Sequence, residues 1–187
     1  MEETGIPNPS SETMSNITIS SELREQVRQA REAYLQLANL STESKNQVLH
    51  AFAKALRANT SKILEANALD VVEAEKMVQS GELSESACKR VMLNEAKVEL
   101  MAQNCESVAK LEDPVGKVLQ ATRLDEGLDL YRVSCPIGVV LVIFESRPDV
   151  VVQISALAVK SGNAVILKGG REAVHSNRVL AEILRQT

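Results

Sequence analysis

The stretch Cys135-Pro-Ile-Gly-Val-Val-Leu-Val-Ile-Phe-Glu-Ser-Arg-Pro-Asp149 carries the strongest structural signal in this sequence. Its run 139–144 is apolar and rich in β-branched residues without polar alternation, which is typical of a strand buried on both faces in a parallel sheet. A second short apolar strand is predicted at 164–167. The intervening segment 145–163 is long enough for the helical crossover that parallel strands require. We therefore predict one βαβ unit, with a right-handed connection, followed by a last helix through Arg185.

A β-hairpin and a helical region are predicted upstream of this unit. Two stretches, 117–123 and 128–133, flank Asp125-Glu126-Gly127, and a glycine-bearing turn of this kind suits a hairpin. Between residues 21 and 112 apolar side chains recur every three or four positions, which is the period of an amphipathic helix. Residues 1–20 are rich in Ser, Asn, Thr and Pro, and such a composition cannot bury enough apolar surface to offset its ordering entropy.

Cap signals divide the helical region into several helices. One helix is expected from Ser21, a second after Ser41-Thr42, and another from near Asn94. The second helix either continues or breaks near Asn59-Thr60, and the sequence leaves both alternatives open. We divide the chain into four parts, which are a disordered tail (1–20), a helical region (21–112), a bridging β-hairpin (113–135) and the start of a cofactor-binding domain (136–187).

Composition excludes several classes of function. Aromatic residues make up only 2% of the chain, the net charge is −4 and the pI is about 5.4, so neither stacking platforms nor a basic surface for nucleic acid or anionic membrane is expected. Three cysteines without Cys-x-x-Cys spacing predict neither a disulfide framework nor a zinc site, and we found no metal-ligating constellation. No secretory signal and no membrane-spanning run is present, so a cytoplasmic protein is predicted.

Lys168-Gly169-Gly170 is the first candidate site, because it follows the second predicted strand. In open α/β sheets ligands bind at the carboxyl ends of the strands, and the following helix N-terminus offers unpaired N–H groups to an anion. A lysine at this position, where an NAD site places an acidic residue, suits the 2′-phosphate of NADP. The alternative is an ordinary helix start beside a solvated lysine.

The second candidate is Glu145-Ser146-Arg147-Pro148, which follows the first predicted strand and therefore lies at the same edge of the sheet. These side chains can orient a charged substrate, and the alternative is a solvated loop. The cysteines are weaker candidates: Cys105 falls on an apolar helical stripe, Cys88 lacks an evident base, and Cys135 precedes the buried strand, which favours a structural role.

Several motifs together resemble one enzyme family, γ-glutamyl phosphate reductase (glutamate-5-semialdehyde dehydrogenase) of the aldehyde dehydrogenase superfamily. The resemblance runs from about Ser21 to Thr187. The matching blocks are Cys135–Asp149, Ser161-Gly-Asn163, Leu167-Lys-Gly-Gly170, His175-Ser-Asn177, Asn67-x-x-Asp70 and Leu111-Glu-Asp-Pro-Val-Gly-Lys117. The resemblance implies an aldehyde dehydrogenase-like α/β fold, with a helical region, a hairpin and the first βαβα of an incomplete Rossmann-like parallel sheet.

The resemblance implies NADPH-dependent reduction of γ-glutamyl phosphate to glutamate 5-semialdehyde, the second step of L-proline biosynthesis. In that chemistry a cysteine thiolate displaces phosphate from the acyl phosphate, and NADPH delivers hydride to the thioester. The resemblance implies that the complete enzyme is a homo-oligomer and that it can associate with a glutamate kinase. The expected NADP-binding residues are Phe144, Glu145, Lys168, Gly169 and Gly170, and the substrate-side candidates are Ser146 and Arg147.

The nucleophile marks where this chain departs from the family pattern. In the family the nucleophilic cysteine lies well downstream of the Lys-Gly-Gly segment, in a separate catalytic domain, and none of the three cysteines here matches it. We therefore expect no catalytic residue in this chain and a nucleophilic cysteine beyond Thr187. Two alternatives remain open: the chain is the N-terminal portion of a reductase, or it is a short non-catalytic product that binds cofactor or associates with full-length subunits.

Overall fold

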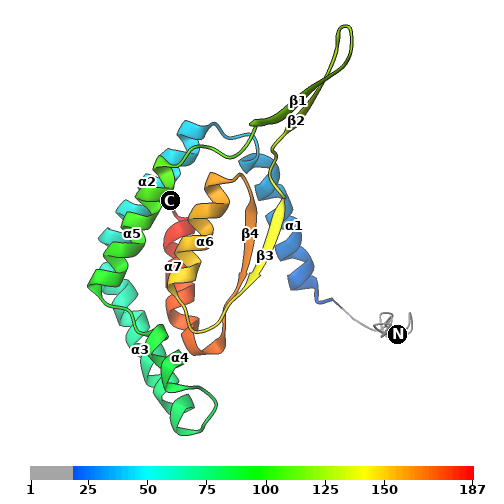
Figure 1. The fold of residues 1–187 in the computed structure, drawn as a ribbon. Coiled ribbons are helices and arrows are strands. Elements are labelled where there is room, and N and C mark those ends of the chain that lie inside the picture. Colours follow the sequence, from blue (N-terminus) through cyan, green and yellow to red (C-terminus); the bar gives the residue numbers. More distant parts are fainter. Residues whose placement is uncertain (1–18) are drawn as a thin grey trace, which may run out of the picture.

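The computed structural model describes residues 19–187, so that all but two residues of the predicted tail lie outside the described residues. Helices and two separate strand pairs make up the fold (Figure 1). In chain order they are α1 (Ser21–Leu37), α2 (Thr42–Ala58), α3 (Thr60–Gln79), α4 (Glu85–Val91), α5 (Glu95–Lys110), β1 (Val118–Asp125), β2 (Leu128–Val133), β3 (Val139–Ile143), α6 (Asp149–Lys160), β4 (Ala164–Lys168), a 3₁₀ turn (Arg171–Ala173) and α7 (Val174–Arg185).

The helix starts follow the cap residues of the sequence. Ser20, Ser41 and Asn94 each accept a hydrogen bond from the backbone N–H three residues further on, which satisfies one of the free donors of a helix N-terminus. The predicted starts of α1, α2 and α5 are therefore confirmed. The open question near Asn59-Thr60 is settled as a break, because α2 ends before Asn59 and α3 begins after it. The sequence did not separate α4 as a helix.

The main core lies between α2, α5, α6 and α7, with the start of α3 at its edge. It is built mainly of aliphatic side chains, as the low aromatic content predicts, and Phe52 is the aromatic residue among its buried members. Its most deeply buried members are Leu49, Ala53, Leu56, Ile63, Val98, Ala102, Cys105, Val152 and Leu180. In Figure 1 these helices form a layer on one side of the β3–β4 pair.

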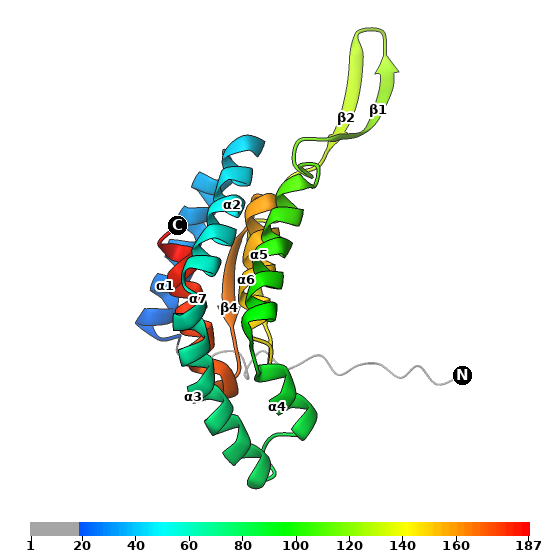
Figure 2. The same ribbon diagram turned by 90° about the vertical axis from the view of Figure 1, so that its left-hand side faces the viewer.

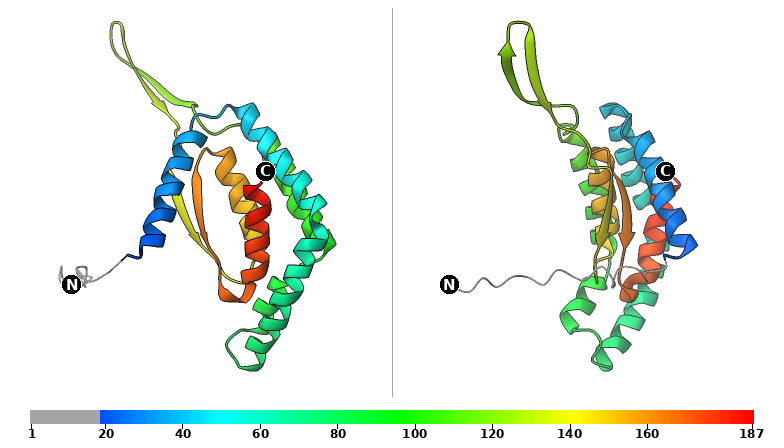
Figure 3. Two further views of the ribbon diagram at one scale, coloured as in Figure 1. Left: turned by 180° about the vertical axis from the view of Figure 1, so that it is seen from behind. Right: turned by 90° about the vertical axis from the view of Figure 1, so that its right-hand side faces the viewer.

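The predicted βαβ unit is confirmed, because β3 and β4 pair in parallel with α6 between them in the chain. The expectation that these strands are buried on both faces is wrong. Leu141 and Ile143 on β3 are 59% and 67% exposed. The strands lie between α6 and α7 on one side and α1 on the other (Figure 3), but α1 runs mainly along β4 and leaves β3 open. A strand of this composition normally has a covering layer on each face.

The β1–β2 hairpin projects away from the helices as a two-stranded antiparallel ribbon (Figure 2). Its turn contains Gly127 at φ +74°, a left-handed conformation that glycine adopts without steric cost. Every residue of both strands is exposed, including Leu130 and Tyr131. Across residues 19–187, no helix combines the length and the apolar character that a membrane span requires.

Candidate functional site

Two adjacent loops at the carboxyl ends of β3 and β4 form the candidate site. The strands are parallel neighbours, so the loops that follow them lie at one edge of the sheet. The backbone N–H of Phe144 donates to the carbonyl of Lys168 at 3.1 Å, which continues the strand pairing into the loops. The structure therefore brings together the two sequence segments, 144–147 and 168–170, that contain all the candidate binding residues.

The side chains of these loops differ sharply in exposure. Glu145, Arg147 and Lys168 are exposed to solvent, as binding residues for a charged ligand can be. The Arg147 guanidinium donates to the Asp149 carboxylate at 3.2 Å, so it is held at the start of α6. Ser146 is only 3% exposed, and its hydroxyl turns inward rather than toward solvent. Sequence reasoning treated Ser146 and Arg147 alike, but the structure separates them.

Glu172 is a residue of this site that sequence reasoning missed. Its carboxylate is 5% exposed and accepts hydrogen bonds from the backbone N–H and the hydroxyl of Ser146, the latter at 3.2 Å. The two site loops are thus joined by a buried side chain as well as by the backbone. The available signal was an acidic residue shortly after a Gly-Gly pair, where a helix begins and its dipole favours negative charge.

The expectation of free N–H groups for an anion at the start of α7 is wrong for two of those groups. The buried carboxylate of Asp70, on α3, accepts from the backbone N–H of His175 at 2.9 Å and of Ser176 at 2.7 Å. Asn67, one turn earlier on α3, donates to the Ser176 hydroxyl at 3.0 Å. The anion at this helix end is therefore a side chain of the protein, and α3 fixes the helix that follows the Lys168 loop.

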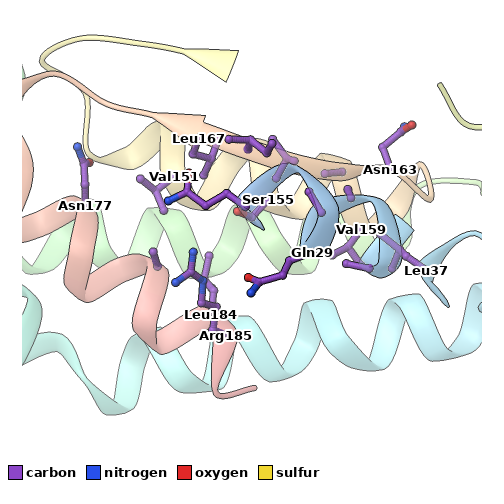
Figure 4. Close-up of a pocket in the computed structure, with 18 of the residues that line it drawn as sticks. Gln29, Leu37, Val151, Ser155, Val159, Asn163, Leu167, Asn177, Leu184 and Arg185 are labelled. Carbon is purple, nitrogen blue, oxygen red and sulfur yellow. The ribbon is translucent and has the colours of Figure 1, made fainter. Parts of the chain in front are cut away.

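An open cavity of about 810 Å³ lies between α1 and the β4, α6 and α7 elements (Figure 4). Its walls are mainly apolar, with Asn177 at one end and Asn163 and Leu37 at the other. The end near Asn177 includes Phe144 and Gly169, two of the expected cofactor residues. The volume is within the range of about 300–1,000 Å³ that is typical of small-molecule sites.

Asn177 explains why residue 169 is glycine. A Cβ at Gly169 would overlap the Asn177 amide, so a side chain there would displace Asn177. Within the part of the chain that the structure describes, the Asn177 Oδ1 atom is buried and accepts no hydrogen bond. A buried carbonyl oxygen without a donor is unfavourable, and at the end of a cavity it is a candidate acceptor for a bound group.

The cysteines lie apart from one another in the structure. Cys105 is fully buried in the main core, as predicted, and burial raises the pKa of its thiol to about 11. Cys88 is buried in a smaller cluster beside Ala74 and Val91. Cys135 is exposed where the chain enters β3. A thiol of raised pKa is a poor nucleophile at neutral pH, which argues against a catalytic role for Cys105.

The structure has helices packed on the parallel β3–β4 pair, a projecting hairpin and a candidate site at the carboxyl ends of the strands. These are the features that the sequence leads us to expect of an aldehyde dehydrogenase-like α/β protein. A family model described as the aldehyde dehydrogenase family matches residues 8–187. The chain belongs to the aldehyde dehydrogenase family.

Within that family, the chain is similar to curated gamma-glutamyl phosphate reductases. The chain is 53% identical over 157 residues to the gamma-glutamyl phosphate reductase of Natronomonas pharaonis, and the alignment covers 84% of this chain and 36% of that protein. It is 45% identical to the probable gamma-glutamyl phosphate reductase of Schizosaccharomyces pombe, with 87% and 36% covered. The chain therefore spans little more than a third of the length of these relatives.

Solved structures agree. The gamma-glutamyl phosphate reductase of Saccharomyces cerevisiae superimposes with a TM-score of 0.83 at 45% identity, over 90% of this chain and 42% of that one. The Thermotoga maritima reductase gives 0.81 at 39% identity, over 88% and 39%. A methylmalonate-semialdehyde dehydrogenase of Oceanimonas doudoroffii, at 19% identity and a TM-score of 0.63 over 90% and 32%, shows the shared fold alone. The predicted aldehyde dehydrogenase-like fold class is confirmed.

Proposed function

We propose that this chain is the N-terminal part of an NADPH-dependent γ-glutamyl phosphate reductase, which forms glutamate 5-semialdehyde in L-proline biosynthesis. The observation that carries the proposal is the 53% identity, over 84% of the chain, to a protein named for that reaction. The second candidate is a short non-catalytic product that binds cofactor or associates with full-length subunits. This second candidate is retained because the chain spans only 36% of the length of that relative.

The residues of the two loops fit a phosphorylated nucleotide cofactor. Lys168 is an exposed cation beside two glycines, and its charge suits the 2′-phosphate of NADPH. Gly169 and Phe144 line the cavity end where the Asn177 oxygen lacks a donor, and a cofactor hydroxyl or amide can supply one. Glu145 and Gly170 complete the proposed binding set. When bound, NADPH supplies the hydride for the reduction.

Arg147 is the proposed substrate residue of this chain. Its guanidinium is half exposed and only partly engaged by Asp149, so it retains donors for an anionic group of γ-glutamyl phosphate. Ser146 supports the same loop from inside, because its hydroxyl donates to Glu172 rather than facing the solvent.

The remaining parts of the proposal concern the complete enzyme. We place the nucleophilic cysteine in the remaining polypeptide, since Cys105 and Cys88 are buried in cores and Cys135 lies at the opposite end of β3 from the site loops. The complete enzyme is proposed to be homo-oligomeric and cytoplasmic and to associate with a glutamate kinase. The exposed apolar residues of the hairpin support a homo-oligomer, because apolar patches of this kind mark interaction surfaces.

The decisive experiment compares the 187-residue chain with a completed chain, in which residues 1–187 are joined to the C-terminal part of the Saccharomyces cerevisiae relative. We expect the completed chain to oxidise NADPH in the presence of γ-glutamyl phosphate and the 187-residue chain to show no turnover. Turnover by the 187-residue chain would refute the placement of the nucleophile. An inactive completed chain, together with co-purification of the 187-residue chain with full-length subunits, would favour the second candidate.

Lys168→Ala in the completed chain tests the cofactor. We expect NADPH binding to weaken by about 1.5–3 kcal/mol, the contribution of a charge-assisted hydrogen bond, with a much smaller change for NADH. Equal losses for the two cofactors would show that Lys168 does not recognise the 2′-phosphate. Arg147→Ala is expected to raise the KM for γ-glutamyl phosphate more than that for NADPH, and an unchanged substrate KM would make Arg147 a solvated loop residue.

A further inference from the structure

Ser146 adopts a backbone conformation that L-amino acids rarely take. Its φ is +53°, and among residues 19–187 it is the only non-glycine residue with a positive φ. In this left-handed region the Cβ crowds the following carbonyl oxygen, so an L-residue needs a compensating interaction to remain there. Ser146 lies between Glu145 and Arg147, so its conformation determines how the loop leaves β3 and enters α6.

The compensating interaction comes from Glu172. The Oε1 atom of this carboxylate accepts from both the backbone N–H and the hydroxyl of Ser146. Both residues are more than nine-tenths buried, so water does not compete for these hydrogen bonds. A charged acceptor strengthens a hydrogen bond, and a buried polar group left without its partner is strongly unfavourable.

Gly170 makes room for this carboxylate. A Cβ at residue 170 would overlap the Glu172 carboxylate, although the φ of Gly170, −74°, is open to any residue. A side chain at residue 170 would therefore displace the Glu172 carboxylate from its contact with Ser146, whereas the backbone conformation there does not call for glycine. The second glycine of the Lys-Gly-Gly segment thus serves the contact between the two loops.

We propose that Glu172 is a positioning residue, which locks the left-handed turn at Ser146 and thereby holds the substrate loop in a fixed relation to the cofactor loop. We call this pair of hydrogen bonds from Ser146 to Glu172 the lock. It joins two loops that a ligand has to bridge, since Arg147 belongs to one loop and Lys168 to the other. Its consequence for kinetics rests on the proposed function. The lock itself is a property of the two loops and can be measured without any turnover.

Amide hydrogen exchange at Ser146 in the completed chain measures the lock directly. We expect Glu172→Ala to accelerate exchange at the Ser146 amide by roughly tenfold or more, because its buried acceptor is removed. The matched control is Glu182→Ala, which removes an exposed carboxylate from α7 and leaves the Ser146 amide protected. If Glu172→Ala does not fold, Glu172→Met, which keeps most of the volume and removes both acceptor oxygens, replaces it. Unchanged exchange would overturn the proposal, whatever the activity of the chain.

Steady-state kinetics and a glycine rescue test the positioning role. We expect Glu172→Gln to raise the KM for γ-glutamyl phosphate while the NADPH affinity changes less. Glycine takes a φ of +53° without strain, so the same change made in a Ser146→Gly background should have a smaller effect on that KM than in the Ser146 background. Equal effects in the two backgrounds, or faster exchange with unaltered kinetics in an active enzyme, would overturn the positioning role. An inactive completed chain that still shows the exchange effect would refute the proposed function and leave the lock standing.

Discussion

Leucine and isoleucine side chains occur both in the helical core and in the two strand pairs of this chain, but they are buried to very different extents. Leu56 and Ile63 in the helices are fully buried, whereas Leu130 in the hairpin is 57% exposed and Ile143 in β3 is 67% exposed. A helix satisfies its own backbone hydrogen bonds and needs one packed face, whereas a strand needs neighbours at its edges and cover on its faces. The difference teaches that residues 19–187 bury the apolar side chains of their helical core. The same residues leave apolar side chains of both strand pairs exposed, without further neighbouring strands or a covering layer over them.

The difference also agrees with the comparisons. The chain spans 36% of the Natronomonas pharaonis relative and 42% of the Saccharomyces cerevisiae chain. Large apolar residues are exposed along both strand pairs, where further strands or covering layers would bury them. Substitutions in each region test whether the two regions are as different energetically as they are in exposure.

The largest effect is expected from truncating a core side chain. Leu56→Ala should lower the free energy of unfolding by about 2–5 kcal/mol, since it leaves a cavity among packed helices. Leu130→Ala, the matched change in the hairpin, should alter it by less than about 0.5 kcal/mol. Urea unfolding of the 187-residue chain, followed by the helical far-UV dichroism, measures both, and comparable losses would break the comparison.

The cysteines sharpen the comparison through their reactivity. Burial raises the pKa of the Cys105 thiol to about 11, so its reactive thiolate is scarce at pH 8 and increases as the pH approaches that value. Cys135 is exposed at the entry to β3. Iodoacetamide at pH 8 should therefore modify Cys135 roughly a hundredfold faster than Cys105, as peptide mass spectrometry can measure. Similar rates at the two sites would show that the core opens readily.

The ion pair at the base of the hairpin joins the two regions. Lys45, 2% exposed on α2, donates to Asp113 at 3.0 Å, next to the segment that leads into β1. Burial raises the pKa of Asp113, but hydrogen bonds from the Val115 N–H, Lys45 and Thr42 outweigh it, and the net pKa is lowered. A lowered pKa adds stability above the pKa of the unfolded state, about 3.9, and this stability is lost as the pH falls through the folded pKa.

Asp113→Asn is expected to cost about 1–3 kcal/mol at pH 7, because buried Lys45 loses its charged partner. The cost should shrink as the pH falls below 4, where the unaltered carboxyl also takes up a proton. Glu112→Gln is the control, since the Glu112 side chain is 83% exposed in its pair with Lys117 and should contribute little. Urea titrations at pH 7 and pH 3 measure both, and a pH-independent cost for Asp113→Asn would contradict the assignment.

The smallest change in stability is expected on the open face of the sheet. Ile143→Lys should alter the free energy of unfolding by less than about 0.5 kcal/mol, because the side chain is already mostly exposed. It should nevertheless reduce self-association of the 187-residue chain, since a charge on an open strand discourages pairing with another copy. Sedimentation velocity measures this, and a large loss of stability would mean that β3 is covered after all.

The amino-acid sequence by itself determined most of the elements and their order, although it did not separate α4 and left the break between α2 and α3 open. The three-to-four-residue apolar period predicted the helices, and the glycine-bearing turn at Asp125–Gly127 predicted the hairpin. The apolar runs 139–144 and 164–167, which flank a crossover of sufficient length, predicted the parallel pair. These signals are local, because capping, turn conformation and amphipathic period depend on neighbours in the chain. The adjacency of the two candidate loops followed from the same reasoning, since parallel strands end at one edge.

Only the tertiary structure decided which groups face each other within that edge. Glu172 reaches Ser146 across 26 positions of sequence, and Asp70 reaches the start of α7 across 105. Sequence reasoning placed a free anion site where Asp70 lies, and expected cover on both faces of β3 where Ile143 is open. Both depend on distant partners, whose presence no local pattern reports, because burial and hydrogen bonding are settled by packing rather than by propensity.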